Sequence, residues 1–85
     1  MKISLLYFAS LREALGTGHE SVELPPGIGT AGDLRKWLAA RGDPWSAQFA
    51  EGRAVRVAIA KQMAATDTAL FDGAEVAFFP PVTGG

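Results

Sequence analysis

The sequence has 85 residues, ten glycines, no cysteine and a formal net charge of −1. A chain of this size buries only about 60–65% of the surface that its unfolded form exposes, which leaves room for one core and no second domain. The lack of cysteine excludes disulfides, zinc–thiolate sites, iron–sulfur clusters and thiol nucleophiles. Eight Lys and Arg are scattered among nine Asp and Glu, so we expect no nucleic-acid partner.

No stretch approaches the roughly 20 apolar residues of a membrane span. The first residues contain one lysine and a short apolar run, but Arg12 and Glu13 interrupt this run before it reaches the length of a signal peptide. We therefore expect a cytoplasmic protein with no membrane partner.

The N-terminal part of the chain predicts two strands joined by a short helix. Residues 2–9 alternate their apolar side chains between two faces, which is typical of a β-strand. Ser10 and Glu13 have the spacing of a capping box, so we expect a helix to begin there and to end at Gly16. Residues 19–24 alternate again and predict a second strand.

The main helix is predicted in the middle of the chain. Thr30 and Asp33 form a second capping pattern, and apolar residues follow at helical spacing until Gly42. Asp43 and Pro44 then resemble an N-cap with proline at the first helical position, which predicts a short third helix.

The remaining strands complete an α+β domain. Alternation predicts strands at 54–60 and 74–79, with a short extra strand between 62 and 70. Because strands and helices do not alternate regularly, we expect a mixed sheet of four to five strands, with the main helix on one face and short extra helices. Residues 1–79 would form this domain, and residues 80–85 a flexible C-terminal tail.

One main helix covers only one face of the sheet. The alternation places Leu6, Phe8, Ala77 and Phe79 on the other face, which is then more apolar than a solvated sheet face normally is. Large exposed apolar surfaces usually mark interfaces. The alternative is a second small core under the tail.

A glycine-rich segment matches the dinucleotide fingerprint G-x-G-x-x-G through Gly27, Gly29 and Gly32. Two prolines separate it from the preceding strand, the next strand ends without the acidic residue that holds a ribose, and the chain is too short for a doubly wound sheet. We therefore interpret the segment as a crossover loop.

No catalytic or metal-binding cluster is visible among the polar residues. His19 has no serine or acid at the spacing of a triad or metal site, and we expect a solvated turn residue. Asp67, Asp72 and Glu75 fit turn caps and strand edges better than a carboxylate site.

The C-terminal segment suggests a chemical role. Pro80 and Pro81 lack N–H donors, so they end sheet pairing and project the chain outward. Residues 80–85 span at most about 20 Å, and Gly84 and Gly85 are thin enough for a narrow channel. ATP can activate the terminal carboxylate as an acyl-adenylate, and sulfide attack then gives a thiocarboxylate. The alternative is a frayed terminus.

This C-terminal run, from Asp72 to Gly85, resembles that of the small, sulfur-carrying subunit of molybdopterin synthase, the MoaD family. Residues 7–9 leading into Arg12 and Glu13, and residues 15–17, are a weaker second match. The resemblance covers the whole chain and implies a ubiquitin-like β-grasp fold.

The resemblance implies a carrier cycle. Gly85 would be adenylated by a MoeB-like, ATP-dependent enzyme and would receive sulfur from a persulfide donor. The tail would then enter the active site of a MoaE-like large subunit, which supplies the catalytic side chains and converts precursor Z to molybdopterin within a heterotetramer. The chain itself would bind no cofactor. The inserted residues would be Pro80, Pro81, Val82, Thr83, Gly84 and Gly85.

The resemblance also implies a docking patch of Phe8, Met63 and Phe79 for both partners. One departure is the turn at residues 60–62, which begins with Ala60 where such proteins often have asparagine. Two alternatives stay open: a sulfur carrier for thiazole synthesis, and a protein modifier conjugated to lysines through its diglycine.

Overall fold

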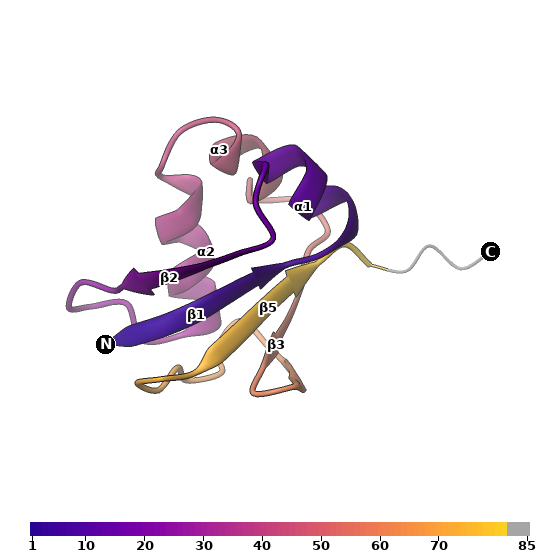
Figure 1. Cartoon of the computed structure of the whole chain (residues 1–85). Helices are drawn as coiled ribbons and strands as arrows, with labels where there is room; N and C mark the ends of the chain where they lie inside the picture. The colour runs from indigo at the N-terminus through magenta and orange to yellow at the C-terminus, as the bar shows by residue number, and fades with distance from the viewer. Residues whose placement is uncertain (82–85) are drawn as a thin grey trace.

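The computed structural model describes residues 1–81, which form one sheet and three helices (Figure 1). The elements follow one another as β1 (Lys2–Tyr7), α1 (Ala9–Leu15), β2 (His19–Glu23), α2 (Ala31–Ala39), α3 (Trp45–Gln48), β3 (Arg56–Ile59), β4 (Gln62–Ala64) and β5 (Glu75–Phe79).

The sheet is mixed and five-stranded, with the order β2-β1-β5-β3-β4. The central strand, β5, is parallel to its neighbour β1, although the two strands come from opposite ends of the described chain. All other neighbouring strands are antiparallel. The predicted α+β fold is therefore confirmed, and the short strand expected between residues 62 and 70 is β4.

The first helix begins earlier than the capping pattern predicts. Phe8 still belongs to the β-ladder, because its N–H donates to Phe78 O at 3.1 Å, and the chain turns into α1 directly after it. Phe8 is the N-cap and makes no side-chain cap bond, so the prediction of Ser10 as the N-cap is wrong. Gly16 ends the helix at φ 75, as predicted.

The second helix has the predicted capping box. The Asp33 N–H donates to Thr30 Oγ1 at 3.1 Å, and the Thr30 N–H donates to Asp33 Oδ2 at 3.3 Å. These bonds satisfy donors that the first helical turn leaves unpaired. The helix ends at Ala39, before the predicted Gly42.

The third helix is displaced by one residue from the prediction. Pro44 is its N-cap and Trp45 its first residue, so Asp43 does not cap the helix backbone. The Asp43 carboxylate instead accepts a hydrogen bond from the Ser46 hydroxyl at 2.6 Å.

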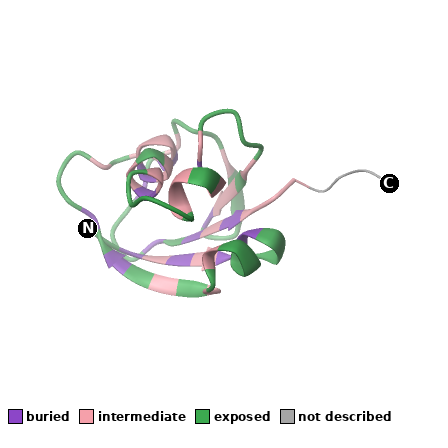
Figure 2. Cartoon of the chain, turned by 90° about the horizontal axis from the view of Figure 1, so that it is seen from above, coloured by how far each residue is buried: buried purple, intermediate pink, exposed green. Residues whose placement is uncertain are grey.

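The core lies between the sheet and the helices, where alternate residues of the strands are buried (Figure 2). Its centre is aromatic: the Phe78 ring lies 5.0 Å from Phe49 and 6.4 Å from Tyr7, measured between ring centroids. The buried core residues are Ile3, Leu5, Tyr7, Leu11, Val22, Leu24, Ala31, Leu34, Leu38, Phe49, Ile59, Leu70, Ala74, Val76 and Phe78.

Candidate functional site

The face of the sheet opposite the helices carries a continuous row of side chains, one from each strand. Strand pairing places Leu6 beside His19 on one side and Ala77 on the other, and it continues through Ala58 to Met63. Four of these five residues are apolar. The predicted placement of Leu6 and Ala77 on the open face therefore agrees with the pairing. Away from this row the same face is largely polar, with Ser21, Arg56 and Glu75 among its residues.

Met63 at one end of this row, together with Phe8 and Phe79, forms a set of large apolar side chains that we call the open-face patch. Phe8 is 47% exposed and Met63 is 59% exposed. Phe79 is only half-buried rather than fully exposed, and it is flanked by Phe8 on one side and by its pairing partner Arg56 on the other. The three residues lie on one face, with Met63 about 10 Å away, two strands from β5.

The candidate tail begins where the sheet ends. Strand β5 stops at Phe79, as the two prolines predict, and Pro80 and Pro81 continue past the end of the sheet (Figure 1). Because β1 and β5 are parallel, Phe8 and Phe79 lie at the same end of the sheet. Residues 82–85, which include Val82, Thr83, Gly84 and Gly85, lie outside the described residues.

The glycine-rich segment has a structural explanation. The Gly32 N–H donates to Thr66 O at 2.8 Å, and a Cβ on Gly32 would lie 3.0 Å from that oxygen. Gly27 occupies a turn at φ +98, which only glycine adopts readily. These contacts support the interpretation of a crossover loop.

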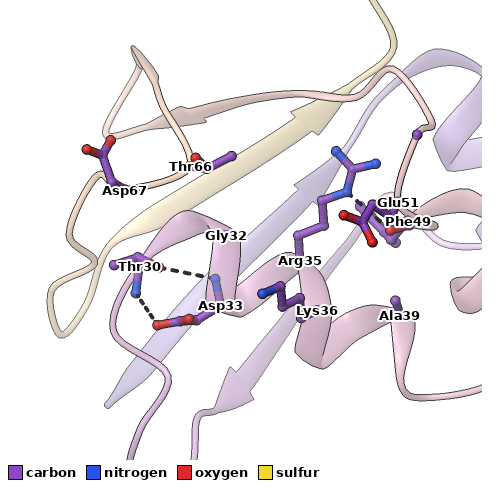
Figure 3. Close-up of a pocket in the computed structure, with 11 residues that line it drawn as sticks. Thr30, Gly32, Asp33, Arg35, Lys36, Ala39, Phe49, Glu51, Thr66 and Asp67 are labelled. Carbon is purple, nitrogen blue, oxygen red and sulfur yellow. Dashed lines mark hydrogen bonds between the residues drawn. The ribbon is translucent and has the colours of Figure 1, made fainter.

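Arg35 has a structural role that the sequence gives no means of predicting. Its guanidinium donates to three backbone carbonyls after α3, those of Phe49 (3.1 Å), Ala50 (2.7 Å) and Arg53 (2.6 Å). It lies beside a hollow of about 670 Å³ between α2, the segment after α3 and the turn at Thr66 (Figure 3). Arg35 therefore joins two segments of the fold, a contact that we call the Arg35 clamp, and it has few donors left for a ligand.

A second polar cluster joins β2 to the helices. The Arg41 guanidinium lies 5.0 Å from the Trp37 ring centroid and 4.6 Å from that of Trp45, and it makes two hydrogen bonds to Glu20, at 3.0 and 3.1 Å. The Tyr7 hydroxyl donates to the same carboxylate at 2.9 Å. Burial, together with this bond to Glu20, raises the pKa of Tyr7 far above its usual value. The cluster therefore has a structural role, because it connects β2 to the helices.

The other polar residues bring no catalytic group together. The Asp72 carboxylate accepts the Lys2 N–H at 2.7 Å, while His19 is exposed and is the first residue of β2 rather than a turn residue. Within residues 1–81, no three His, Cys, Asp or Glu side chains lie close enough to hold a metal ion. None of the helices described there is long and apolar enough to cross a membrane.

The turn between β3 and β4 contains Ala60, the residue at which the sequence departs from the resemblance. Ala60 and Lys61 are its two central residues, and both have positive φ, at 51 and 67. Asparagine and glycine tolerate this conformation better than alanine or lysine. The departure at Ala60 therefore places strain in the turn beside Met63 and leaves the hairpin intact.

Comparison with known proteins places the molecule in a family. A family model described as the ThiS family matches residues 5–85, nearly the whole chain and both terminal glycines. The chain belongs to the ThiS family.

Two curated relatives of this ThiS-family chain have the same name, molybdopterin synthase sulfur carrier subunit. The protein of Escherichia coli K12 is 40% identical over 83 residues, which are 98% of this chain and 99% of the relative. The protein of Haemophilus influenzae is 37% identical with the same coverage.

Solved structures of other proteins share the fold. The Haloferax volcanii HVO 2177 protein is 30% identical, with a TM-score of 0.81 over 100% of this chain and 87% of that one. Small archaeal modifier protein 1 of the same organism is 28% identical, with a TM-score of 0.69 over 95% and 98% of the two chains. The likeness confirms the ubiquitin-like β-grasp fold of this ThiS-family chain.

A further solved structure contains a partner chain. It is the complex of subunits 1 and 2 of molybdopterin-converting factor from Helicobacter pylori, with 19% identity and a TM-score of 0.66 over 100% of both chains. At this identity the comparison shows the fold alone. In that protein, subunits 1 and 2 form a complex.

Proposed function

We propose that this chain is the sulfur carrier subunit of a molybdopterin synthase and that Gly85 carries the sulfur as a thiocarboxylate. The observation that carries the proposal is the 40% identity, over nearly the full length, to a protein of that name. The family match that extends through residue 85 adds support, because it includes the glycines that the chemistry requires.

The architecture suits delivery of a reactive chain end. Pro80 and Pro81 leave β5 at one end of the sheet, and four residues of fully extended chain would span at most about 13–14 Å. Paired glycines at the end present the carboxylate without side chains that would block a narrow site. Pro80 through Gly85 would thus enter the active site of the large subunit.

The chemistry needs groups that the partners supply. A Gly85 carboxylate oxygen attacks the α-phosphate of ATP on an adenylating enzyme, pyrophosphate leaves, and an acyl-adenylate forms. A persulfide donor then provides a sulfur that displaces AMP, and a thiol releases the thiocarboxylate. This chain has no cysteine, so its carboxyl end is the group on which it would carry sulfur. ATP is the substrate of the adenylating enzyme, and the cycle would proceed in the cytoplasm.

The open-face patch is the proposed docking surface for both partners. Phe8 and Phe79 lie at the end of the sheet from which the tail departs, and Met63 extends the apolar surface to β4. A partner that binds this face therefore receives the tail in a fixed direction. Exposed aromatic and methionine side chains are enriched at protein interfaces.

Intact-mass spectrometry tests the proposal. The chain is incubated with an adenylating enzyme, ATP and a persulfide donor, and we expect the mass to increase by the exchange of one oxygen for sulfur. A variant that lacks Gly85 should keep its melting temperature and show no exchange, because the chain end contributes little burial. Conjugates to lysine without any exchange would contradict the proposal.

The second candidate function is a protein modifier. The 28% identity to small archaeal modifier protein 1 favours it, because conjugation also begins with an activated C-terminal carboxylate. A carrier for thiazole synthesis is a closer variant of the first proposal. Supplying the thiocarboxylated chain separately to precursor Z with a large subunit, and to a thiazole synthase, distinguishes these two sulfur acceptors.

A further inference from the structure

Strand β2 leaves one backbone edge without a partner within residues 1–81. It pairs only with β1, at one end of the strand order. Two hydrogen bonds fix the phase of this pairing: Tyr7 N–H donates to Gly18 O at 3.0 Å, and Leu24 N–H donates to Met1 O at 2.8 Å. Since antiparallel hydrogen bonds alternate every two residues, the backbone groups of Glu20 point toward β1.

The intervening residues direct their backbone groups outward. These are His19, Ser21 and Glu23, whose side chains are exposed on the open face. The Thr17 hydroxyl contacts His19 N and O, at 3.4 and 3.0 Å, at the start of this edge. Natural edges are protected by short length, charged side chains, proline or a bulge. Strand β2 is only five residues long and carries two glutamates, but it contains no lysine or proline.

The edge is complementary to itself. If two β2 strands run antiparallel about Ser21, the two Ser21 residues face each other and form a hydrogen-bonded pair. His19 then lies opposite Glu23 of the second strand, and the same pair occurs again on the other side of the axis. Each His–Glu pair has side chains on one face with Cβ atoms about 4.5–5.5 Å apart.

We propose that two copies of this chain associate through their β2 edges, centred on Ser21, to form a continuous ten-stranded sheet. The pairing closes about a two-fold axis, so it forms a dimer and does not propagate into a filament. About six backbone hydrogen bonds are available from His19, Ser21 and Glu23. The 3.4 Å contact of the His19 N–H with Thr17 is replaced by one of them.

The charges of the edge favour a second copy over an unrelated strand. On the helix side, Glu20 is already paired with Arg41 at 3.0 Å, so it brings no unpaired charge to the contact. Glu23 is bound to the terminal amine of Met1 at 3.0 Å, but its side chain remains 73% exposed and can accept further bonds. His19 and Glu23 therefore supply matched partners in this register.

The dimer is compatible with the proposed function, on which it does not depend. The strand β4, which carries Met63, lies at the opposite edge of the sheet from β2. The open-face patch and the ends of both β5 strands stay accessible. Because the two-fold axis reverses one copy relative to the other, the two β5 strands would end at opposite ends of the ten-stranded sheet. The short edge makes the contact weak, in the class of transient interfaces.

Sedimentation velocity of the full chain up to millimolar concentration tests this inference. We expect the sedimentation coefficient to rise with concentration, together with slower hydrogen exchange of the Ser21 amide. Ser21→Pro removes the central outward N–H and should keep the protein monomeric with its fold intact, because this N–H lies outside the β1 ladder. Ser21→Ala keeps the N–H and is the matched control, which should still associate.

A charge exchange tests the register. His19→Glu places like charges opposite each other and should weaken association by about tenfold. Adding Glu23→His to that variant places a histidine opposite each glutamate again and should restore association. A monomer at all concentrations would overturn the inference, as would association that Ser21→Pro leaves unchanged. If Ser21→Pro weakens only binding to a large subunit or an adenylating enzyme, the edge belongs to that partner and the self-pairing is wrong.

Discussion

The two faces of the sheet consist of alternate residues of the same strands, yet they differ in what covers them. Toward the helices, Leu5 and Val76 are 0% exposed and Phe78 is 1% exposed. On the open face, their neighbours Leu6 and Phe79 remain partly exposed. Both faces carry large apolar side chains, so the hydrophobicity of a single residue does not separate those that fold the chain from those available to a partner. The position of the helices separates them.

Substitution of two adjacent phenylalanines, one on each face, should give the largest difference in stability. Phe78→Ala removes a fully buried ring at the centre of the aromatic core, and we expect it to lower the free energy of unfolding by about 3–5 kcal/mol. Phe79→Asp changes a half-buried ring on the open face and should leave the protein folded. Thermal unfolding followed by circular dichroism measures both.

For partner binding, we expect the open-face residue Phe79 to matter most, whereas for stability we expect the core residue Phe78 to matter most. Phe79→Asp should weaken affinity for a molybdopterin synthase large subunit by at least tenfold, measured by calorimetry, because it places a charge in the open-face patch. Lys36→Asp, on the exposed side of α2, is the matched control and should leave affinity unchanged. Equal affinity of the wild-type and Phe79→Asp proteins would show that partners use another surface.

Removal of the Arg35 clamp should have the next largest effect. Arg35→Met keeps the apolar stem but leaves the carbonyls of Phe49, Ala50 and Arg53 without their charged donor. We expect a loss of about 2–3 kcal/mol in urea unfolding. Lys36→Met, at the adjacent exposed position, should change stability by less than about 0.5 kcal/mol. Similar losses in both variants would show that the clamp contributes nothing specific.

The fold was predictable from the sequence where the pattern is local. Alternation located β1, β2, β3 and β5 within about two residues, whereas β4 was expected only somewhere between residues 62 and 70. The Thr30–Asp33 box located the start of α2. The pattern failed at Ser10, because the long-range bond of the Phe8 N–H to Phe78 O continues the ladder to the residue where α1 begins. A contact between opposite ends of the chain leaves no trace in local spacing.

The candidate site was predictable only in part, for the same reason. The sequence pattern indicated that Phe8 and Phe79 share a face, whereas the row through Ala58 to Met63 follows from the pairing of β3 with β5 and β4. The Arg35 clamp depends on a loop placed by tertiary packing. The role of Gly85 comes from the C-terminal sequence and the family, and it stays a prediction.

Relief of strain in the β3–β4 turn should have a smaller effect, of opposite sign. Ala60→Asn with Lys61→Gly suits the positive φ angles of both residues and should stabilise the protein by about 1 kcal/mol, or about 4–8 °C in melting temperature. Lys36→Gly, in a helix, should destabilise it and is the control. A lower melting temperature of the turn variant would contradict the inference that the turn is strained. Unchanged partner affinity would show that the hairpin positions Met63 but that residues 60 and 61 do not contact the partner.

The smallest effect is expected at the start of α2, in the pH dependence of stability. Hydrogen bonds from the Gly29 and Thr30 N–H groups lower the pKa of Asp33 below its usual value of 3.8. The folded state therefore holds the carboxylate ionised at a pH where the unfolded chain is protonated. This stabilisation is complete above about pH 4 to 5 and is lost as the pH falls through the lowered pKa. Asp33→Asn should melt below the wild type at neutral pH and approach it as the solution is acidified. Asp67→Asn, at an exposed position, is the control. If the difference in melting temperature between the wild type and Asp33→Asn stays constant from about pH 7 to pH 2, the carboxylate charge plays no part in capping the helix.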